Sequence, residues 1–251
     1  VEFRGGLPGA GWDGSPRVRM QGYWRDGLAK LSGENRRLLV FGDELLVYEG
    51  NAILRGRIHK IHRQSPTMGA QPPAGAIRIF DGSSTPRLDG AQITADGLLK
   101  EGSITVDEFQ DFVLHVEFRT PFMPAAEGQK RGNSGVYIQE RYEVQILDSF
   151  GLDGLFNECG GIYRTREPDL NMCLPPLAWQ TYDICFRAAR FDDAGNKSEN
   201  ARITVRQNGV LIHNDYEIPN KTGAGKQEAP TPGPIKFQDH NDPVRFRNIW
   251  I

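Results

Sequence analysis

The chain has 251 residues, of which 38% are hydrophobic, and its 30 Lys and Arg against 32 Asp and Glu give a formal net charge of −2. That length suits one large β or α/β domain, or a main domain with a small companion. The charges are spread along the sequence without the basic patch of a nucleic-acid-binding protein. No apolar run approaches the roughly 18 residues of a membrane-spanning helix, so both classes are excluded.

The N-terminal part of the sequence predicts a small β unit followed by a connector. The 29 glycines and 16 prolines of the chain, without long helical periodicity, favour short strands joined by turns. Short alternating runs such as RRLLVF and ELLVYEG predict the strands of this unit. Residues 64–76, QSPTMGAQPPAGA, are rich in Pro, Gly and Ala and have no periodicity, as a connector does. We therefore divide the chain into residues 1–76 and residues 77–251.

Longer strands are expected in the main domain. DFVLHVEFRT, residues 111–120, alternates apolar and polar side chains as a half-buried antiparallel strand does. Two alternating runs flank Asn208–Gly209, the dipeptide preferred in a type I′ hairpin. Roughly a dozen strands at hairpin spacing, with almost no helix, predict an all-β, two-sheet sandwich.

Three cysteines are too few for a disulfide framework and lack zinc-type spacing. Cys159 and Cys173 flank the loop CGGIYRTREPDLNMC. One interpretation is a disulfide between them in an exported protein, which would close a loop of about 15 residues and stabilise the fold by about 3 kcal/mol. The other interpretation is three reduced, buried thiols, with Cys185 in the apolar strand YDICF.

Two predicted strands carry hydrogen-bonding and titratable groups on their solvent faces. Glu143 and Gln145 share one face of YEVQILD, and the polar residues of PIKFQDH alternate with buried Ile235 and Phe237. Taken singly, each polar residue is an ordinary solvated strand position, but if both strands line one concave sheet they form a polar groove suited to a carbohydrate. The polar residues of the second strand are Lys236, Gln238 and His240, and the aromatic residues expected to stack on sugar faces are Tyr137, Tyr163 and Trp179.

Asp148 follows Glu143 and Gln145 one step out of phase with strand alternation. A β-bulge near Leu147 would bring it onto the same face. The pattern resembles the E-x-D-x-x-E strand of laminarinase- and lichenase-like glycoside hydrolases, whose first Glu is the nucleophile and whose last is the acid/base. Here an amide replaces the central acid and the last acid is one carbon shorter. Because a retaining displacement needs two carboxyl groups about 5–5.5 Å apart, these changes disfavour the classical mechanism.

A set of motifs occurs in order in residues 77–251: IFDG, DFVLHVEFR, RGNSGVYIQ, YEVQILDS, ECGGIY, WQTYDI, NGV and GPIKFQDH with VRFRNIWI. Together they resemble the 3-keto-disaccharide hydrolase family. The resemblance implies a concanavalin A-like jelly roll that acts on sugars oxidised at C3. GGLPGAGWDG and SPTMGAQPPAGA resemble the N-terminal extension of exported bacterial members, whose mature chains follow a signal peptide. The chain begins at Val1 without such a segment, so we expect a processed protein that is secreted or periplasmic.

A 3-keto group removes the need for two carboxylic acids. It acidifies the C2 proton, so one base can form an enediolate, after which the C1 substituent is expelled and water adds back. We predict Glu143 and His240 as the acid/base pair, in either order, with Asp148 orienting or tuning one of them. The predicted substrate contacts are Gln145, Gln238, Asn133, Lys236, Arg141, Tyr163 and Trp179.

Other interpretations of these residues remain open. Asn133 in GNSG would equally serve a tight turn, and Arg245 and Arg247 are expected to pair with acids on neighbouring strands. No cofactor is required, although a divalent metal held by Glu143, Asp148 and His240 would polarise the ketone. The alternative functions are a non-catalytic carbohydrate-binding module on the same fold and a classical retaining glucan hydrolase. The linkage, the aglycone and the oligomeric state are left open.

Overall fold

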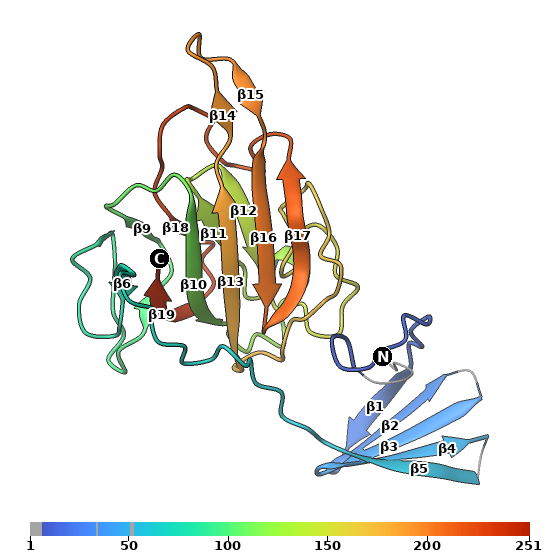
Figure 1. The fold of residues 1–251 in the computed structure, drawn as a ribbon. Coiled ribbons are helices and arrows are strands. Elements are labelled where there is room, and N and C mark those ends of the chain that lie inside the picture. The colour runs from blue at the N-terminus through green and yellow to red at the C-terminus, as the bar shows by residue number, and fades with distance from the viewer. Residues whose placement is uncertain (1–6, 34, 51–52) are drawn as a thin grey trace. The chain divides into compact units, whose positions relative to one another are not determined.

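Strands make up nearly all the regular structure of the chain, in the computed structural model that describes residues 7–33, 35–50 and 53–251. Within these residues the one helical element is a 3-10 turn, η1 (Gly128–Lys130). No helix of the described chain is long and apolar enough to span a membrane. The predicted all-β class is confirmed (Figure 1).

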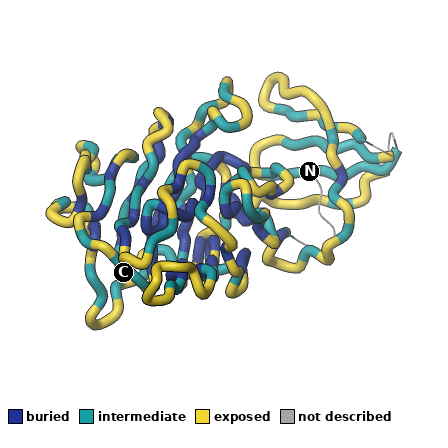
Figure 2. The backbone as a smooth tube through the Cα atoms, turned by 90° about the horizontal axis from the view of Figure 1, so that it is seen from above, coloured by how far each residue is buried: buried dark blue, intermediate teal, exposed yellow. Residues whose placement is uncertain are grey.

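The chain divides into two compact units, residues 1–63 and residues 64–251. The first unit is an antiparallel meander whose five strands pair in chain order. None of the described residues of these strands is buried, as the teal and yellow tube of this unit shows in Figure 2. The first six residues of the predicted N-terminal unit lie outside the described ones. The strands are β1 (Gln21–Arg25), β2 (Leu28–Gly33), β3 (Arg36–Phe41), β4 (Glu44–Glu49) and β5 (Ile53–His59).

The second unit is a jelly-roll sandwich of two antiparallel sheets (Figure 1). The larger sheet has the order β17-β16-β13-β10-β19-β6, with β8 also paired to β19, and the smaller has the order β12-β11-β18-β9-β7. A separate ribbon pairs β14 (Arg190–Phe191) with β15 (Lys197–Glu199). The larger sheet contains β6 (Arg78–Phe80), β8 (Leu99–Lys100), β10 (Phe112–Arg119), β13 (Trp179–Arg187), β16 (Ala201–Gln207), β17 (Val210–Ile218) and β19 (Arg245–Trp250). The smaller contains β7 (Leu88–Asp89), β9 (Ser103–Thr105), β11 (Ser134–Ile138), β12 (Tyr142–Ile146) and β18 (Lys236–Phe237).

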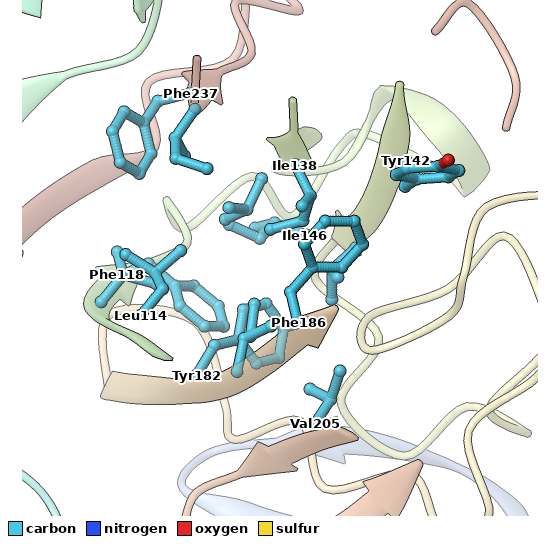
Figure 3. Packing of buried hydrophobic residues seen from close by; sticks show 14 of the residues in the cluster. Leu114, Phe118, Ile138, Tyr142, Ile146, Tyr182, Phe186, Val205 and Phe237 are labelled. Atoms are coloured by element: carbon cyan, nitrogen blue, oxygen red, sulfur yellow. The ribbon is translucent and has the colours of Figure 1, made fainter. Parts of the chain in front are cut away.

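The core lies between the two sheets. Phe118 and Tyr182 from the larger sheet, with ring centroids 4.7 Å apart, lie in the same cluster as Ile146 and Phe237 from the smaller sheet (Figure 3). Because side chains alternate along each strand, every second residue of both sheets points away from this core. Those outward positions on the smaller sheet are where the candidate site is built.

The Asn208–Gly209 hairpin is confirmed. Gln207 pairs with Val210, which leaves a two-residue loop whose φ values of 52° and 78° are those of a type I′ turn. Arg245 and Arg247 also pair with acids as expected: Arg245 Nη1 lies 2.6 Å from Glu101 Oε2, and Arg247 Nε lies 2.6 Å from Glu117 Oε2.

The division between the two units falls earlier than the sequence analysis places it. The composition of residues 64–76 predicts a connector that belongs to the N-terminal part, whereas the structure groups these residues with the sandwich. The reason is side-chain and backbone hydrogen bonding that composition does not reveal. Thr67 Oγ1 donates to Asp183 (2.7 Å) and the backbone N–H of Gly69 donates to Glu117 (2.6 Å), so the segment is fixed to the outer face of the larger sheet.

Cys159 and Cys173 are free, buried thiols, so the predicted disulfide is not present in the structure. Each sulfur has hydrogen-bond partners of its own. The Cys159 thiol lies 3.2 Å from the Tyr182 hydroxyl, and Cys173 Sγ lies 3.5 Å from the Leu147 carbonyl. Loop length alone does not reveal these contacts. Cys185, expected to be buried, is exposed.

We predict that Glu117→Gln lowers the free energy of unfolding by about 2–3 kcal/mol, because Glu117 is 1% exposed and accepts hydrogen bonds from Gly69, Asn248 and Arg247. Burial alone would raise the pKa of Glu117. Hydrogen bonds to the carboxylate, of which the one from His115 has the largest effect, outweigh burial and lower the pKa to about 2. The stabilisation by the carboxylate is therefore present above pH 4.5 and lost as the pH falls towards 2.

Urea unfolding at pH 7 and pH 3 measures this effect. Glu108→Gln, at an exposed position, is the matched control and should change stability by less than about 0.5 kcal/mol. A stability of Glu117→Gln equal to that of the control at pH 7 would contradict the prediction.

Candidate active site

The site is built on three adjacent strands of the smaller sheet. β11 is central, with β12 on one side and β18 on the other. Tyr137 of β11 pairs with Glu143 of β12 and with Lys236 of β18, so these three residues form one row across the sheet. The neighbouring row, Val136, Val144 and Phe237, is fully buried in the core, which places the Tyr137 row on the opposite face.

A second row on the same face contains Gln145, Gly135 and Gln238. Gly135 pairs with Gln145, and its carbonyl accepts the backbone N–H of Gln238 at 2.9 Å. A Cβ at Gly135 would lie 2.5 Å from Glu143 Oε1, closer than real Cβ atoms approach. Glycine at this strand position therefore makes the space that the Glu143 carboxyl occupies.

Glu143 is 2% exposed, and both of its carboxyl oxygens are held. The Tyr137 hydroxyl donates to Oε2 at 2.7 Å. The Gln145 amide, oriented by its hydrogen bond to the Ser134 carbonyl, donates to Oε1 at 3.1 Å. Burial raises the pKa of Glu143 to about 7, although the Tyr137 hydrogen bond opposes the shift. Such a carboxyl exchanges a proton near neutral pH, as a general base must. The sequence analysis places Glu143 and Gln145 on this face correctly but expects them to be exposed.

The outer edge of β12 is extended by a loop that carries Tyr163. The backbone N–H of Tyr163 donates to the Glu143 carbonyl (3.0 Å), and the Glu143 N–H donates to Thr222 Oγ1 (2.7 Å). A Cβ at Gly223 would lie 2.7 Å from the Tyr163 ring and 3.5 Å from Glu143 Oε2. The predicted aromatic Tyr163 is therefore beside Glu143, with a glycine packed between them.

Two buried acceptors on this face have no hydrogen-bond partner among the described residues. They are Asn133 Oδ1 and Gln238 Oε1. Asn133 is 3% exposed, and its backbone N–H and side-chain nitrogen are bound to Asp242 and to the Gln129 carbonyl, both at 2.7 Å. An unpartnered buried acceptor is costly unless a ligand completes it. Both oxygens are therefore candidate acceptors for a hydrogen-bond donor of a ligand.

The structure does not bring Asp148 and His240 to Glu143. β12 ends at Ile146, before the position of the predicted bulge, and the Asp148 N–H donates to the Arg131 carbonyl at 3.0 Å. Asp148 is buried beyond the strand and forms an ion pair with Arg131 Nε at 2.8 Å. His240 is exposed on the segment after β18, and the described residues show no hydrogen bond from it to Glu143 or Asp148.

Two other predicted contacts have structural roles elsewhere. Trp179 lies in β13 opposite Arg119, on the outer face of the larger sheet, where the Arg247 guanidinium stacks 4.0 Å from its ring centroid. Alternation gives the face of a strand but not the sheet to which the strand belongs, and for this reason the prediction is wrong. Arg141 is 7% exposed and donates to Gln139 Oε1 and to the Thr231 carbonyl, so its guanidinium is already bound.

The described residues show no group of three His, Cys, Asp or Glu side chains able to hold a metal ion. Glu143, Asp148 and His240 therefore do not form the ligand set considered from the sequence. The residues that sequence analysis missed are Gly135, Thr222, Gly223 and the hydrogen-bonding role of Tyr137. A glycine inside an alternating strand was the one signal that pointed to them, because it marks a close approach of another group.

The chain matches a family model described as the 3-keto-alpha-glucoside-1,2-lyase-like domain over residues 75–251. A crystal structure of a "putative glycosyl hydrolase" from Parabacteroides distasonis ATCC 8503 is 29% identical with a TM-score of 0.67, covering 77% of this chain and 91% of its own. A second structure of the same description and organism is 19% identical with a TM-score of 0.50, covering 70% and 92%, and supports the fold alone. A search among curated proteins gives no match.

The chain thus has a jelly-roll fold, and the structure at 29% identity is that of a protein described as a putative glycosyl hydrolase. The chain belongs to the 3-keto-alpha-glucoside-1,2-lyase-like family, as the motifs in its sequence indicated.

We predict that Tyr137→Phe raises the pKa of Glu143 further above 7, because the hydrogen bond that lowers it is lost. Carbon-detected NMR titration of the glutamate carboxyls measures the shift. Tyr142→Phe is the matched control: Tyr142 is equally buried, but its hydroxyl donates to Glu228 and its side chain lies on the core side of β12. An unchanged Glu143 midpoint in Tyr137→Phe would show that the hydroxyl does not hold the carboxylate.

Proposed function

We propose that the protein cleaves 3-keto-glycosides, including 3-keto-disaccharides, by C2 deprotonation, elimination of the C1 substituent and hydration. The observation that carries this proposal is the buried Glu143 carboxyl, whose pKa of about 7 suits a general base at neutral pH. Family membership and the 29% identical glycosyl hydrolase structure support glycoside chemistry of this kind.

In the proposed reaction the Glu143 carboxylate takes the proton from C2 of the keto sugar. The electron pair of that C–H bond moves to the C3 oxygen and forms an enediolate. When the carbonyl re-forms, the pair shifts to C1–C2 and the C1–O bond breaks, releasing the aglycone oxygen with a proton. Water then adds across C1–C2 to give the 3-keto sugar, so the net change is hydrolysis without an oxocarbenium ion.

Other residues of the face would bind the sugar and the developing charge. Lys236 lies beside Tyr137, with its ammonium 6.0 Å from the ring centroid, and is the cation available for the enediolate oxygen. The unpartnered oxygens of Asn133 and Gln238 would accept hydrogen bonds from hydroxyls. His240, exposed at the end of the same segment, is proposed as the proton donor to the leaving oxygen, and Glu143 as the base.

The test is turnover of an aryl 3-keto-glucoside. We expect kcat/KM to rise with pH through about 7 as Glu143 ionises, and Glu143→Gln to lower it by about 10²–10⁴-fold because the base is removed. Glu108→Gln, at an exposed position, should retain wild-type activity.

Two outcomes would reject the proposal. Release of aryl alcohol from the unoxidised glucoside at the same rate would indicate a classical glycosidase. Sugar binding with no turnover at any pH would indicate a carbohydrate-binding module, in which Glu143 only accepts hydrogen bonds from hydroxyls.

A further inference from the structure

Two cations flank Tyr163 in a unit that is acidic as a whole. Residues 64–251 contain 19 Lys and Arg but 25 Asp and Glu. Many of these basic side chains form ion pairs with acidic side chains. Arg166 pairs with Asp169 (2.6 Å), and Lys226 pairs with Glu140. Arg164 and Lys221 have no carboxylate partner among the residues that the structure describes. Their charge is therefore available to a ligand.

The two cations lie on the loops that hydrogen-bond to the outer edge of β12. The Arg164 guanidinium lies 5.4 Å from the Tyr163 ring centroid. Lys221 Nζ donates to the Gly223 carbonyl at 2.8 Å, and a Cβ at Gly223 would lie 2.7 Å from the same ring. Since that Cβ position is also 3.5 Å from Glu143 Oε2, Gly223 links Lys221 and Tyr163 to the proposed base.

The backbone of Arg164 is strained. Its φ of 57° is in the left-handed region, which is unfavourable for a non-glycine residue. The strain is imposed by a tight turn, in which the Thr165 N–H donates to the Ile162 carbonyl (2.8 Å) and Arg166 pairs back with Ile162. The turn places the Arg164 guanidinium beside the Tyr163 ring.

We propose that the leaving group of the natural 3-keto-glycoside carries an anionic group, which Arg164 and Lys221 bind beside Tyr163. This inference rests on the proposed function, because it assumes that the keto sugar occupies the Glu143 face. The sugar ring would then contact Glu143, Asn133 and Gln238, while the aglycone extends over Tyr163 towards the two cations. The ring of Tyr163 would separate the neutral part of the substrate from the charged part.

The test compares two aryl 3-keto-glucosides that differ in one group, a carboxylate or the isosteric carboxamide at the same ring position. Each exposed ion pair contributes up to about fivefold, so we expect wild-type kcat/KM to favour the carboxylate by about 5–25-fold. Arg164→Gln and Lys221→Gln should each lower this preference several-fold, and the double variant should abolish it. The preference of each variant is divided by that of wild type, because this division cancels the intrinsic difference in reactivity between the two leaving groups.

Lys226→Gln is the matched control, since Lys226 is exposed, lies in the same loop and is paired with Glu140. It should keep the wild-type preference, and raising the salt from 0.05 to 0.5 M should reduce that preference in wild type because the cations are screened. Equal kcat/KM for the two substrates, or an equal loss in Lys226→Gln, overturns the inference and leaves the proposed function intact. If neither substrate is turned over, the proposed function fails. The affinities of the carboxylate and carboxamide compounds, measured by calorimetry, then decide whether Arg164 and Lys221 bind the anion.

Discussion

The site depends on the register in which β11 pairs with its two neighbours. Tyr137 meets Glu143 on one side and Lys236 on the other because Val136 meets Val144 and Phe237 in the core. A slip of one residue would move an apolar row out of the core and a buried carboxyl into it, so the hydrophobic pattern and the chemistry specify the same alignment. The face proposed to be catalytic is thus fixed by the same pairing that fixes the core.

Two buried glutamates show how their hydrogen-bond partners decide their roles. Glu117 and Glu143 are both at most 2% exposed, yet the pKa of Glu117 falls to about 2 and that of Glu143 rises to about 7. Glu117 has several donors, including Arg247, and its charge stabilises the fold. Glu143 has Tyr137 and Gln145, which position the carboxyl without offsetting its burial. A raised pKa means that ionising Glu143 costs stability as the pH rises from 4.5 towards 7, a cost expected of a functional group.

Alternation in the sequence was enough to predict which face of a strand each residue occupies. It was correct for Glu143, Gln145 and Lys236, and the turn preference of Asn208–Gly209 located a hairpin. It could not say which sheet a strand joins, so Trp179 was assigned to the wrong face of the sandwich. Nor could it predict what covers a face, which depends on loops distant in sequence. Alternation therefore could not predict that Glu143 is buried or that residues 64–76 pack with the sandwich.

The strands and the loops of the site have different proposed roles. The residues proposed for proton transfer and charge stabilisation, Glu143, Tyr137 and Lys236, lie on strands whose positions the core determines. Those proposed to recognise the aglycone, Arg164 and Lys221, lie on loops that meet only at the edge of β12. Loops of this kind change sequence and length at little cost in stability, whereas the strands cannot. Under the proposed function, the strands therefore determine the chemistry at the sugar ring and the loops determine which aglycone is bound.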